Sequence, residues 1–293
     1  MKVLFIGSKQ MGYHILKLMY SINPESIVGV MTLDDSLDER SRFHEMKLFC
    51  SDNDIDFYIA NNKKHSEIII QSLRPDICFV ISWYWLISKE ILDFVPMGFL
   101  GIHNSLLPKY RGSSPLVWSI INGEKYVGSS LFSFTEGMDE GKIWNQCRFE
   151  LKFYHYIDDI LKLIEKGMLQ FFKESYLLIL EGGLKPHSQD PNEATYSSRR
   201  IPEDGKINFN KSSLQIYNFI RAQSFPYPGA FIDHKGKKII VLKSLPKDRT
   251  YYGTSGQVAK IDNEGVWIIC GDSKAIVLKE MNYNIKISLK DRF

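Results

Sequence analysis

The chain has 293 residues, of which 44% are hydrophobic and 24% charged, and these fractions exclude a mainly disordered protein. The chain has 37 lysines and arginines and 34 acidic residues, so its net charge is +3. A dedicated nucleic-acid-binding domain has a much larger excess of basic residues, so the composition argues against that class of protein. No apolar run reaches the roughly 20 residues that a membrane helix needs, so we expect a soluble protein.

Cysteine usage and the N-terminal sequence indicate a cytoplasmic chain. The four cysteines are scattered and form no CxxC pair, which argues against both a zinc site and a disulfide framework. Free thiols are typical of the cytoplasm. The N-terminal sequence MKVLFIGS has an apolar stretch too short for a signal-peptide core, and it is better interpreted as a buried strand.

The first half of the chain alternates short apolar runs with helical patterns. Four apolar runs are expected to be strands: Lys2–Ile6, Ile27–Thr32, Ile77–Ser82 and Phe99–His103. The helical patterns between them lie at His14–Met19, Glu45–Cys50, Ile68–Leu73 and Ser88–Phe94. Nearly continuous apolar strands separated by helices are typical of a parallel sheet that is covered on both faces. The pattern predicts a doubly wound, Rossmann-like α/β domain, in which ligands bind at the carboxyl ends of the strands.

The second half has a different texture. Two further strands (Val127–Phe134 and Trp144–Leu151) and a long helix (Tyr156–Leu180) are expected, and Gly182-Gly183 is a common helix stop. A short helix is then expected at Ser213–Arg221, followed by five strand-like runs: Phe231–Asp233, Lys238–Leu242, Gly256–Ile261, Val266–Cys270 and Ala275–Met281. The pattern predicts a catalytic domain over 1–183, a polar, proline-containing linker over 184–206, and a small β-rich, barrel-like domain of OB type over 207–293.

Three segments carry residues that suit ligand binding or proton transfer. The turn GSKQMG either begins a helix or, with Lys9, binds an anion. His103 ends the fourth apolar run, and Asp139 lies in the turn EGMDEG. A carboxylate beside a histidine fixes its tautomer and raises its basicity. On spacing alone, a hydrogen-bonded core residue is the favoured interpretation of a lone histidine at a strand end, with proton transfer as the alternative.

Longer motifs narrow the choice. The segments HNSLLPKYRGSSPLVWSIINGE and EGMDEGKI resemble the signature of the 10-formyltetrahydrofolate-dependent formyltransferases. The likeness extends to RRIPEDGKINF, IRAQSFPYPGAF and SGQVAKIDNEGVWIICGD, so it covers nearly the whole chain. That family includes methionyl-tRNA formyltransferase, the sugar N-formyltransferases and, more distantly, glycinamide ribonucleotide formyltransferase. The resemblance implies an enzyme in which an amine attacks the formyl carbon of 10-formyltetrahydrofolate.

The same resemblance implies roles for individual residues. His103 would accept the amine proton, and Asp139 would hold and polarise that histidine. The family also has an asparagine that donates a hydrogen bond to the developing oxyanion, a contribution of about 3 kcal/mol. Here the residue two before His103 is Gly101. We hypothesise that Asn104 or a backbone N–H replaces the missing donor; a weakened or inactive enzyme is the alternative.

The resemblance also implies where the folate binds. The pterin is expected between the segment after the third apolar run and the loop that carries the aspartate, with the binding residues Trp83, Tyr84, Trp85, Leu86, Ile87, Glu136, Gly137 and Asp139. An aromatic cluster such as WYW is otherwise most often part of a core. At the carboxyl end of a strand, ligand binding is the favoured interpretation.

Local charge favours a small acceptor. The transfer-RNA enzymes of the family carry a basic loop after the second strand, but here Thr32–Phe57 holds three cations and eight acids, a balance of −5. Such a surface repels a polyanion. The linker sequence RRIPEDGKINF adds weak support for the sugar branch. We therefore expect an amino sugar, carried as a nucleotide conjugate or a nonulosonic-acid precursor, with substrate-binding residues Lys9, Ser105, Lys109, Tyr110 and Arg111.

Several alternatives stay open. Basic positions at His234–Lys238, Lys286, Lys290 and Arg292 leave methionyl-tRNA as a second acceptor. A folate- or sugar-binding relative without activity, and a formyl-folate hydrolase, are further options. Members of the sugar branch are often dimers, so a homodimer is one expected state, and the product would enter bacterial surface polysaccharides or glycoproteins.

Overall fold

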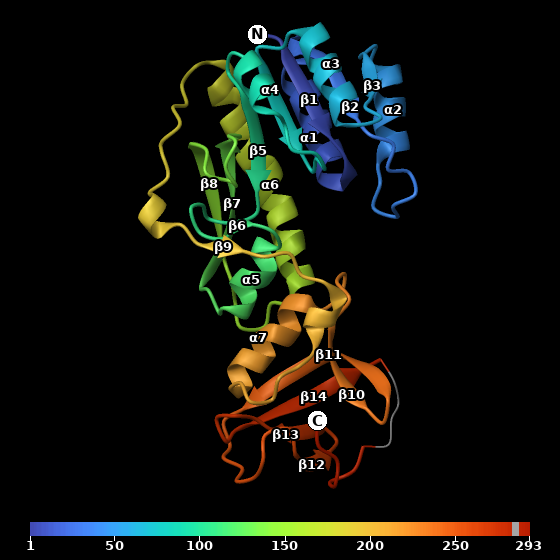
Figure 1. Cartoon of the computed structure of the whole chain (residues 1–293), viewed down its shortest axis with the longest axis vertical. Coiled ribbons are helices and arrows are strands. Elements are labelled where there is room, and N and C mark those ends of the chain that lie inside the picture. The colour runs from blue at the N-terminus through green and yellow to red at the C-terminus, as the bar shows by residue number, and fades with distance from the viewer. Residues whose placement is uncertain (283–286) are drawn as a thin grey trace. The chain divides into compact units, whose positions relative to one another are not determined.

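The computed structural model of the chain describes residues 1–282 and 287–293, and it divides into two compact units (Figure 1). Unit 1 comprises Met1–Arg111, Gly128–Arg148 and Ile164–Tyr196, and unit 2 comprises Gly112–Val127, Phe149–Leu163 and Ser197–Phe293. Lys286, one of the basic positions considered for transfer RNA, lies outside the described residues. In the described ranges, no helix is both long enough and apolar enough to span a bilayer.

A seven-stranded sheet forms the centre of unit 1. Its strand order is β3-β2-β1-β4-β5-β7-β8, with β1 Val3–Gly7, β2 Ile27–Thr32, β3 Phe57–Ile59, β4 Ile77–Ile81, β5 Phe99–His103, β7 Tyr126–Ser133 and β8 Ile143–Glu150. Strands β3, β2, β1, β4 and β5 are parallel to their neighbours, whereas β7 runs antiparallel to β5. This order confirms the predicted doubly wound, Rossmann-like fold.

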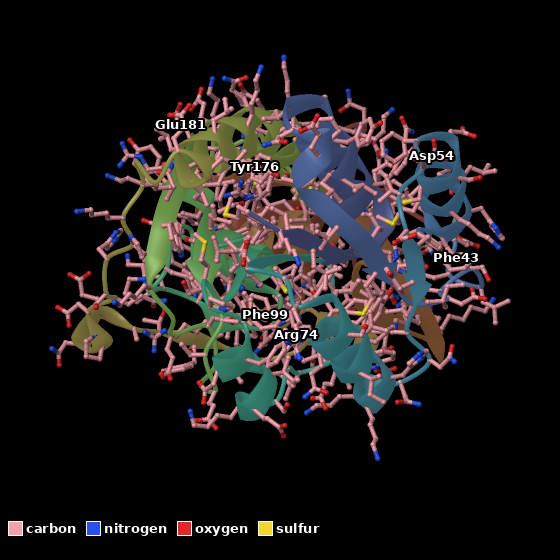
Figure 2. The ribbon with its side chains drawn as sticks, turned by 90° about the horizontal axis from the view of Figure 1, so that it is seen from above. Phe43, Asp54, Arg74, Phe99, Tyr176 and Glu181 are labelled. Carbon is pink, nitrogen blue, oxygen red and sulfur yellow. The ribbon has the colours of Figure 1, made fainter. Side chains whose placement is uncertain are left out.

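Helices cover both faces of this sheet: α1 Lys9–Ile22, α2 Phe43–Asp52, α3 Lys63–Leu73, α4 Lys89–Phe94 and α6 Ile157–Leu180. Figure 2 shows α1 and α6 above the sheet and α3 and α4 below it. Alternate residues of β4 contact opposite layers. The ring of Phe79 packs edge-on against Phe172 and Tyr176 of α6, at centroid distances of 5.5 and 5.3 Å. Val80 belongs to a core cluster with Ile91 of α4.

Unit 2 contains an antiparallel sheet and two helices, α5 Pro115–Ile121 and α7 Ser213–Gln223. The strand order is β10-β11-β14-β13-β12, with β10 Ala230–His234, β11 Lys237–Lys247, β12 Val258–Asp262, β13 Gly265–Ile269 and β14 Ala275–Met281. Ile216 and Ile220 of α7 share a buried core with Ile232, Val241 and Leu278 of the sheet. The predicted β-rich second domain is therefore confirmed as a five-stranded antiparallel sheet.

Short elements account for the differences from the sequence-based prediction. Strand β3, helix α5 and the two-residue strands β6 (Arg111–Gly112) and β9 (Tyr196–Ser197), which pair with each other, were not expected. Three 3-10 turns, at Pro24–Ser26, Pro191–Glu193 and Pro202–Gly205, complete the elements. Strands of two or three residues are too short to display a period, and α5, with seven residues, completes only about two turns, so hydrophobic patterning did not reveal them.

Candidate active site

His103 is the last residue of β5, at the carboxyl end of the central sheet. It pairs in register with Ser130 of β7, and its ring lies edge-on to Phe132 at a centroid distance of 6.2 Å. Only 9% of the residue is exposed. Backbone pairing on β7 and the Phe132 ring therefore hold the imidazole where doubly wound sheets bind their ligands.

Both ring nitrogens of His103 face a polar partner. Nε2 lies 2.8 Å from the carbonyl oxygen of Tyr110, and Nδ1 lies 3.5 Å from Oδ2 of Asp139. The Tyr110 carbonyl and the Asp139 carboxylate both only accept hydrogen bonds, and the shorter contact, to the Tyr110 carbonyl, favours the tautomer with the proton on Nε2. Nδ1 then holds the lone pair. A ring with a proton on each nitrogen would donate to both acceptors.

The two residues that contact His103 have unusual backbone conformations. Tyr110 has φ +58° and Asp139 has φ +49°, in the left-handed region that residues other than glycine rarely occupy. Such conformations cost about 1–3 kcal/mol each and persist where surrounding contacts enforce them. The geometry therefore brings together His103 and Asp139, the two residues predicted as the proton-transfer pair.

Asn104 is not brought to the same face as His103. Its Oδ1 accepts a hydrogen bond from Ser129 Oγ at 2.9 Å. Because Ser130 is the β7 residue paired with His103, and successive strand residues point to opposite faces, Ser129 points to the other face of the sheet. The Asn104 side chain is thus engaged away from the histidine ring.

Gly101 lies on the histidine face, and a phenyl ring fills the space beside it. A Cβ built at Gly101 would meet Cε1 of Phe134 at 2.3 Å and Cζ at 2.6 Å. Phe134 is half-buried against a small cluster of Leu107, Phe132 and Ile143. An asparagine at position 101 is therefore incompatible with the present position of Phe134.

The loop after His103 is held by its own polar groups. Ser105 is buried, its Oγ donates to the carbonyl of Lys109 at 2.6 Å, and its carbonyl accepts from Ser130 Oγ at 2.7 Å. The Ser105 hydroxyl, predicted to bind substrate, thus stabilises the loop. Lys109 itself is exposed. Tyr110, predicted for the same role, contributes its carbonyl to His103.

Arg111, also predicted to bind substrate, is 4% exposed and engaged by residues from the segment expected to be a linker. Its Nε and Nη2 donate to Oε1 of Gln189, at 3.0 and 2.8 Å, and its Nη1 lies 3.2 Å from the hydroxyl of Tyr196. Thr195 adds a hydrogen bond from the Tyr110 backbone N–H to its Oγ1, at 2.8 Å. No motif in the sequence pointed to Gln189 or Thr195.

Lys9 points to an acidic loop. Its Nζ lies 2.8 Å from carboxylate oxygens of both Asp35 and Asp38, and 5.3 Å from the centroid of the Tyr84 ring. Although burial lowers the pKa of Lys9, hydrogen bonds to the two carboxylates raise it by more, so the pKa lies above its usual range. Lys9 thus fastens the loop after β2, and its role in binding a substrate anion stays a prediction.

The two segments expected to hold the folate do meet. A cavity of about 260 Å³ in unit 1 is lined by residues of both, together with two lysines: Lys63, Trp85, Leu86, Ile87, Lys89, Leu92, Phe134, Thr135 and Glu136. Trp83 packs edge-on to Trp85 at 5.2 Å and contacts the core. The Tyr84 hydroxyl donates to Asp35 at 3.2 Å, and Gly137 lies against the Glu140 carboxylate, so neither of these two lines the cavity.

A metal site needs several His, Cys, Asp or Glu side chains close together. Within residues 1–282 and 287–293, no three His, Cys, Asp or Glu side chains come together as a metal site.

Known proteins are similar in sequence to most of this chain. The bifunctional polymyxin resistance protein ArnA of Wigglesworthia glossinidia brevipalpis is 31% identical over 253 residues, which are 86% of this chain but only 39% of that protein. The methionyl-tRNA formyltransferase of Acetivibrio thermocellus is 28% identical and aligns with 97% of this chain and 92% of its own length.

Solved structures share the fold. WlaRD, a sugar 3N-formyl transferase, superimposes with a TM-score of 0.72 over 97% of this chain and 99% of its own, at 22% identity. The N-formyltransferase of Helicobacter canadensis gives 0.71 over 95% and 99%, at 20% identity. Residues 1–165 match the family described as formyl transferase, and residues 200–290 match its C-terminal domain. The chain therefore belongs to the formyl transferase family.

Proposed function

We propose that this formyltransferase moves a formyl group from 10-formyltetrahydrofolate to the amine of an amino sugar. The observation that carries the proposal is the pair His103 and Asp139 at the carboxyl end of β5, with Nδ1 and Oδ2 3.5 Å apart. A neutral amine must lose a proton as it becomes an amide. A base held beside a carboxylate is suited to accept that proton.

The chain's residues divide the proton handling between them. The Tyr110 carbonyl keeps the first proton of His103 on Nε2, at 2.8 Å, so that Nδ1 is the nitrogen that accepts the second. Asp139 then carries the charge opposite to the imidazolium, which stabilises it. When bound, the folate supplies the formyl group and leaves as tetrahydrofolate. The family's side-chain donor to the formyl oxygen is absent at Gly101, and we assign that contact to a backbone N–H.

The cavity between the Trp85–Ile87 segment and the Phe134–Glu136 segment supports a folate site. Its volume of about 260 Å³ lies just below the range of roughly 300–1,000 Å³ typical of whole ligand pockets, so it suits the ring system of the folate. Phe134 and Trp85 offer flat apolar surfaces to a planar ring. Lys63 and Lys89 at the same cavity are complementary to the carboxylates of a folate tail. WlaRD and the Helicobacter canadensis enzyme were crystallised with 5-N-formyl-THF and folinic acid.

Charge supports a small acceptor. Counted with Lys9, which is bound to it, the stretch Thr32–Phe57 has four cations and eight acids, a balance of −4. This surface disfavours a polyanion but accepts a sugar nucleotide, whose few phosphates can be bound elsewhere. Exposed Lys109 remains available for that contact. The Helicobacter canadensis enzyme was crystallised with dTDP-3-aminofucose.

Methionyl-tRNA is the second candidate acceptor. The relative from Acetivibrio thermocellus, which carries that activity in its name, aligns along nearly the whole of both chains. The exposed cations Lys235, Lys237 and Lys238 of unit 2 are compatible with RNA phosphates. As further parts of the proposal, we expect a cytoplasmic homodimer whose product enters bacterial surface polysaccharides.

One assay separates the candidates. The protein is incubated with 10-formyltetrahydrofolate and either a panel of nucleotide-linked amino sugars or charged initiator methionyl-tRNA, with tetrahydrofolate release followed by absorbance and products by mass. A formyl mass increase on a sugar supports the proposal, and one on the methionyl-tRNA replaces it with the second candidate. His103→Asn and Asp139→Asn are the matched controls, because release that survives both changes does not arise at this pair. No product with any acceptor, despite folate binding, indicates an inactive relative.

A further inference from the structure

Gln189 lies between the two backbone segments that hold His103. Its Oε1 accepts two hydrogen bonds from the Arg111 guanidinium, at 3.0 and 2.8 Å. Its Nε2 donates to the backbone carbonyls of Asp139 and Gly141, each at 2.7 Å. A primary amide has two acceptor lone pairs and two N–H donors. All four are used, so the amide group of Gln189 is saturated by this arrangement, which we call the Gln189 bridge (Arg111, Gln189, Asp139 and Gly141).

The bridge closes a ring of contacts around the imidazole. On one side, the Tyr110 carbonyl accepts from His103 Nε2, and the next residue along the chain is Arg111. On the other side, Asp139 faces His103 Nδ1. The side-chain amide of Gln189 contacts both sides, and Gln189 lies outside strand β5, which carries His103. Gln189 therefore ties the side chain of the residue after Tyr110 to the backbone of the turn that carries Asp139.

We propose that Gln189 is a positioning residue that sets the tautomer of His103 and its alignment with Asp139. The inference rests on the proposed function for its catalytic consequence, but its structural content does not. Tyr110 and Asp139 both have left-handed backbones, which neighbouring contacts must enforce. The Gln189 bridge provides such a contact directly at the Asp139 carbonyl, and near Tyr110 it acts through the guanidinium of the next residue, Arg111.

Only an amide can make both halves of the bridge. A carboxylate at this position still accepts hydrogen bonds from the Arg111 guanidinium. It has no N–H to donate to the carbonyl oxygens of Asp139 and Gly141, so those two hydrogen bonds are lost. A leucine side chain loses both halves. Gln189→Glu and Gln189→Leu therefore break the bridge to different extents, and the glutamate variant keeps Arg111, which is 4% exposed, paired.

The matched control is Gln170 on α6, which is exposed and donates to Glu174 at 2.6 Å. Gln170→Glu introduces the same chemical change as Gln189→Glu far along the chain from both turns. It is expected to leave activity and the His103 ring unchanged.

The first readout is independent of activity. At a pH where the ring is neutral, the 15N chemical shifts of the His103 nitrogens report which one carries the proton. The chain has seven histidines, so the His103 signals are assigned by their loss in His103→Asn. We expect one protonated and one lone-pair nitrogen in the wild type, and shifts that move toward each other in Gln189→Leu because the two tautomers then exchange. Averaged shifts in the wild type, or unchanged shifts in Gln189→Leu, overturn the proposal.

The second readout is the split between kcat and KM in formyl transfer. Misplacement of a reacting group by about 1 Å costs about 100-fold in rate, so kcat of Gln189→Glu should fall by about that factor while KM changes little. A kcat within threefold of the wild type contradicts a positioning role. If Gln189→Leu does not fold, Gln189→Glu decides both readouts. If the wild type transfers no formyl group to any acceptor, the proposed function fails, and the 15N shifts still decide whether the bridge orders the histidine.

Discussion

The contact between Gly101 and Phe134 gives the sharpest test of the site's geometry. An alanine Cβ at position 101 would lie 2.3 and 2.6 Å from two carbons of the Phe134 ring and 3.1 Å from the Val80 carbonyl oxygen. Carbon atoms in contact need about 3.5–4.0 Å, so Gly101→Ala forces the ring to move. Overpacking of this kind costs about 1–3 kcal/mol of unfolding free energy.

Removal of the ring should reverse the sign of the effect. Phe134→Ala alone lowers the free energy of unfolding by about 2 kcal/mol, roughly half the loss for a fully buried phenylalanine, because Phe134 is half-buried. In that background, Gly101→Ala meets no ring, and the smaller backbone entropy of alanine in a strand stabilises by about 0.5–1 kcal/mol. The coupling free energy between the two positions, the difference between these two effects of Gly101→Ala, is then about 1.5–4 kcal/mol.

Urea unfolding of the wild type, both single variants and the double variant, followed by far-UV circular dichroism, measures this cycle. Gly183→Ala is the control, because its Cβ would meet Leu178 only at the ordinary distance of 3.6 Å. It should change stability by less than about 0.5 kcal/mol. Additive free energies at positions 101 and 134, with no coupling, would refute the reasoning. With coupling established, Gly101→Asn combined with Phe134→Ala makes room for the family's asparagine. Because Phe134 also lines the proposed folate cavity, kcat of the double variant at saturating folate should exceed that of Phe134→Ala alone.

Three further outcomes follow from the same contacts. His103→Asn should lower kcat by about 10²–10⁴-fold in the formyl-transfer assay, and a smaller loss would indicate that another group is the base. Asn104→Ala should keep kcat within about twofold and lose about 1 kcal/mol in urea unfolding, the value of its hydrogen bond; a large fall in turnover would assign the missing donor to that side chain. Hydrogen bonds from Arg40 and Lys9 hold the pKa of Asp38 well below its usual range, so its stabilising effect is complete above about pH 4 and is lost as the pH falls further. Thermal unfolding of Lys9→Met should therefore show a shallower loss of stability below pH 4 than the wild type, and parallel curves would contradict the Lys9 contact.

The central sheet was predictable because its strands are buried on both faces. Ile27–Thr32 and Phe99–His103 are strands with the expected bounds, since continuous apolar runs ended by polar residues mark such strands without ambiguity. His103 followed from the same reasoning, as the polar residue at a strand end. Asp139 came from family resemblance, because a turn residue 36 positions away has no periodic relation to the strand it faces.

The remaining contacts of the site depend on chain segments that return from a distance. Lys9 was expected to bind an anion, and the sequence gives no sign that the loop carrying Asp35 folds back onto it. Gln189 was hidden in a stretch with the composition of a linker. A glutamine has no charge or redox chemistry to mark it, and its role exists only once Arg111 and the Asp139 turn are placed around it. Hydrophobic patterning along the chain predicts helices and strands. The contacts of Lys9 and Gln189 join segments that are far apart in the sequence, so they become visible only in the folded structure.

The departure from the family at Gly101 and the retained histidine pair can be understood together. Neither polar contact of the His103 ring involves position 101, because Nε2 contacts the Tyr110 carbonyl and Nδ1 faces the Asp139 carboxylate. On the proposed function, loss of an asparagine there would remove an oxyanion donor without changing either contact of the His103 ring. The two residues that face the ring both bear left-handed backbone strain. A histidine that merely fills a core needs one satisfied hydrogen bond and no strained neighbours, so the strain at Tyr110 and Asp139 favours a ring kept in place to exchange protons.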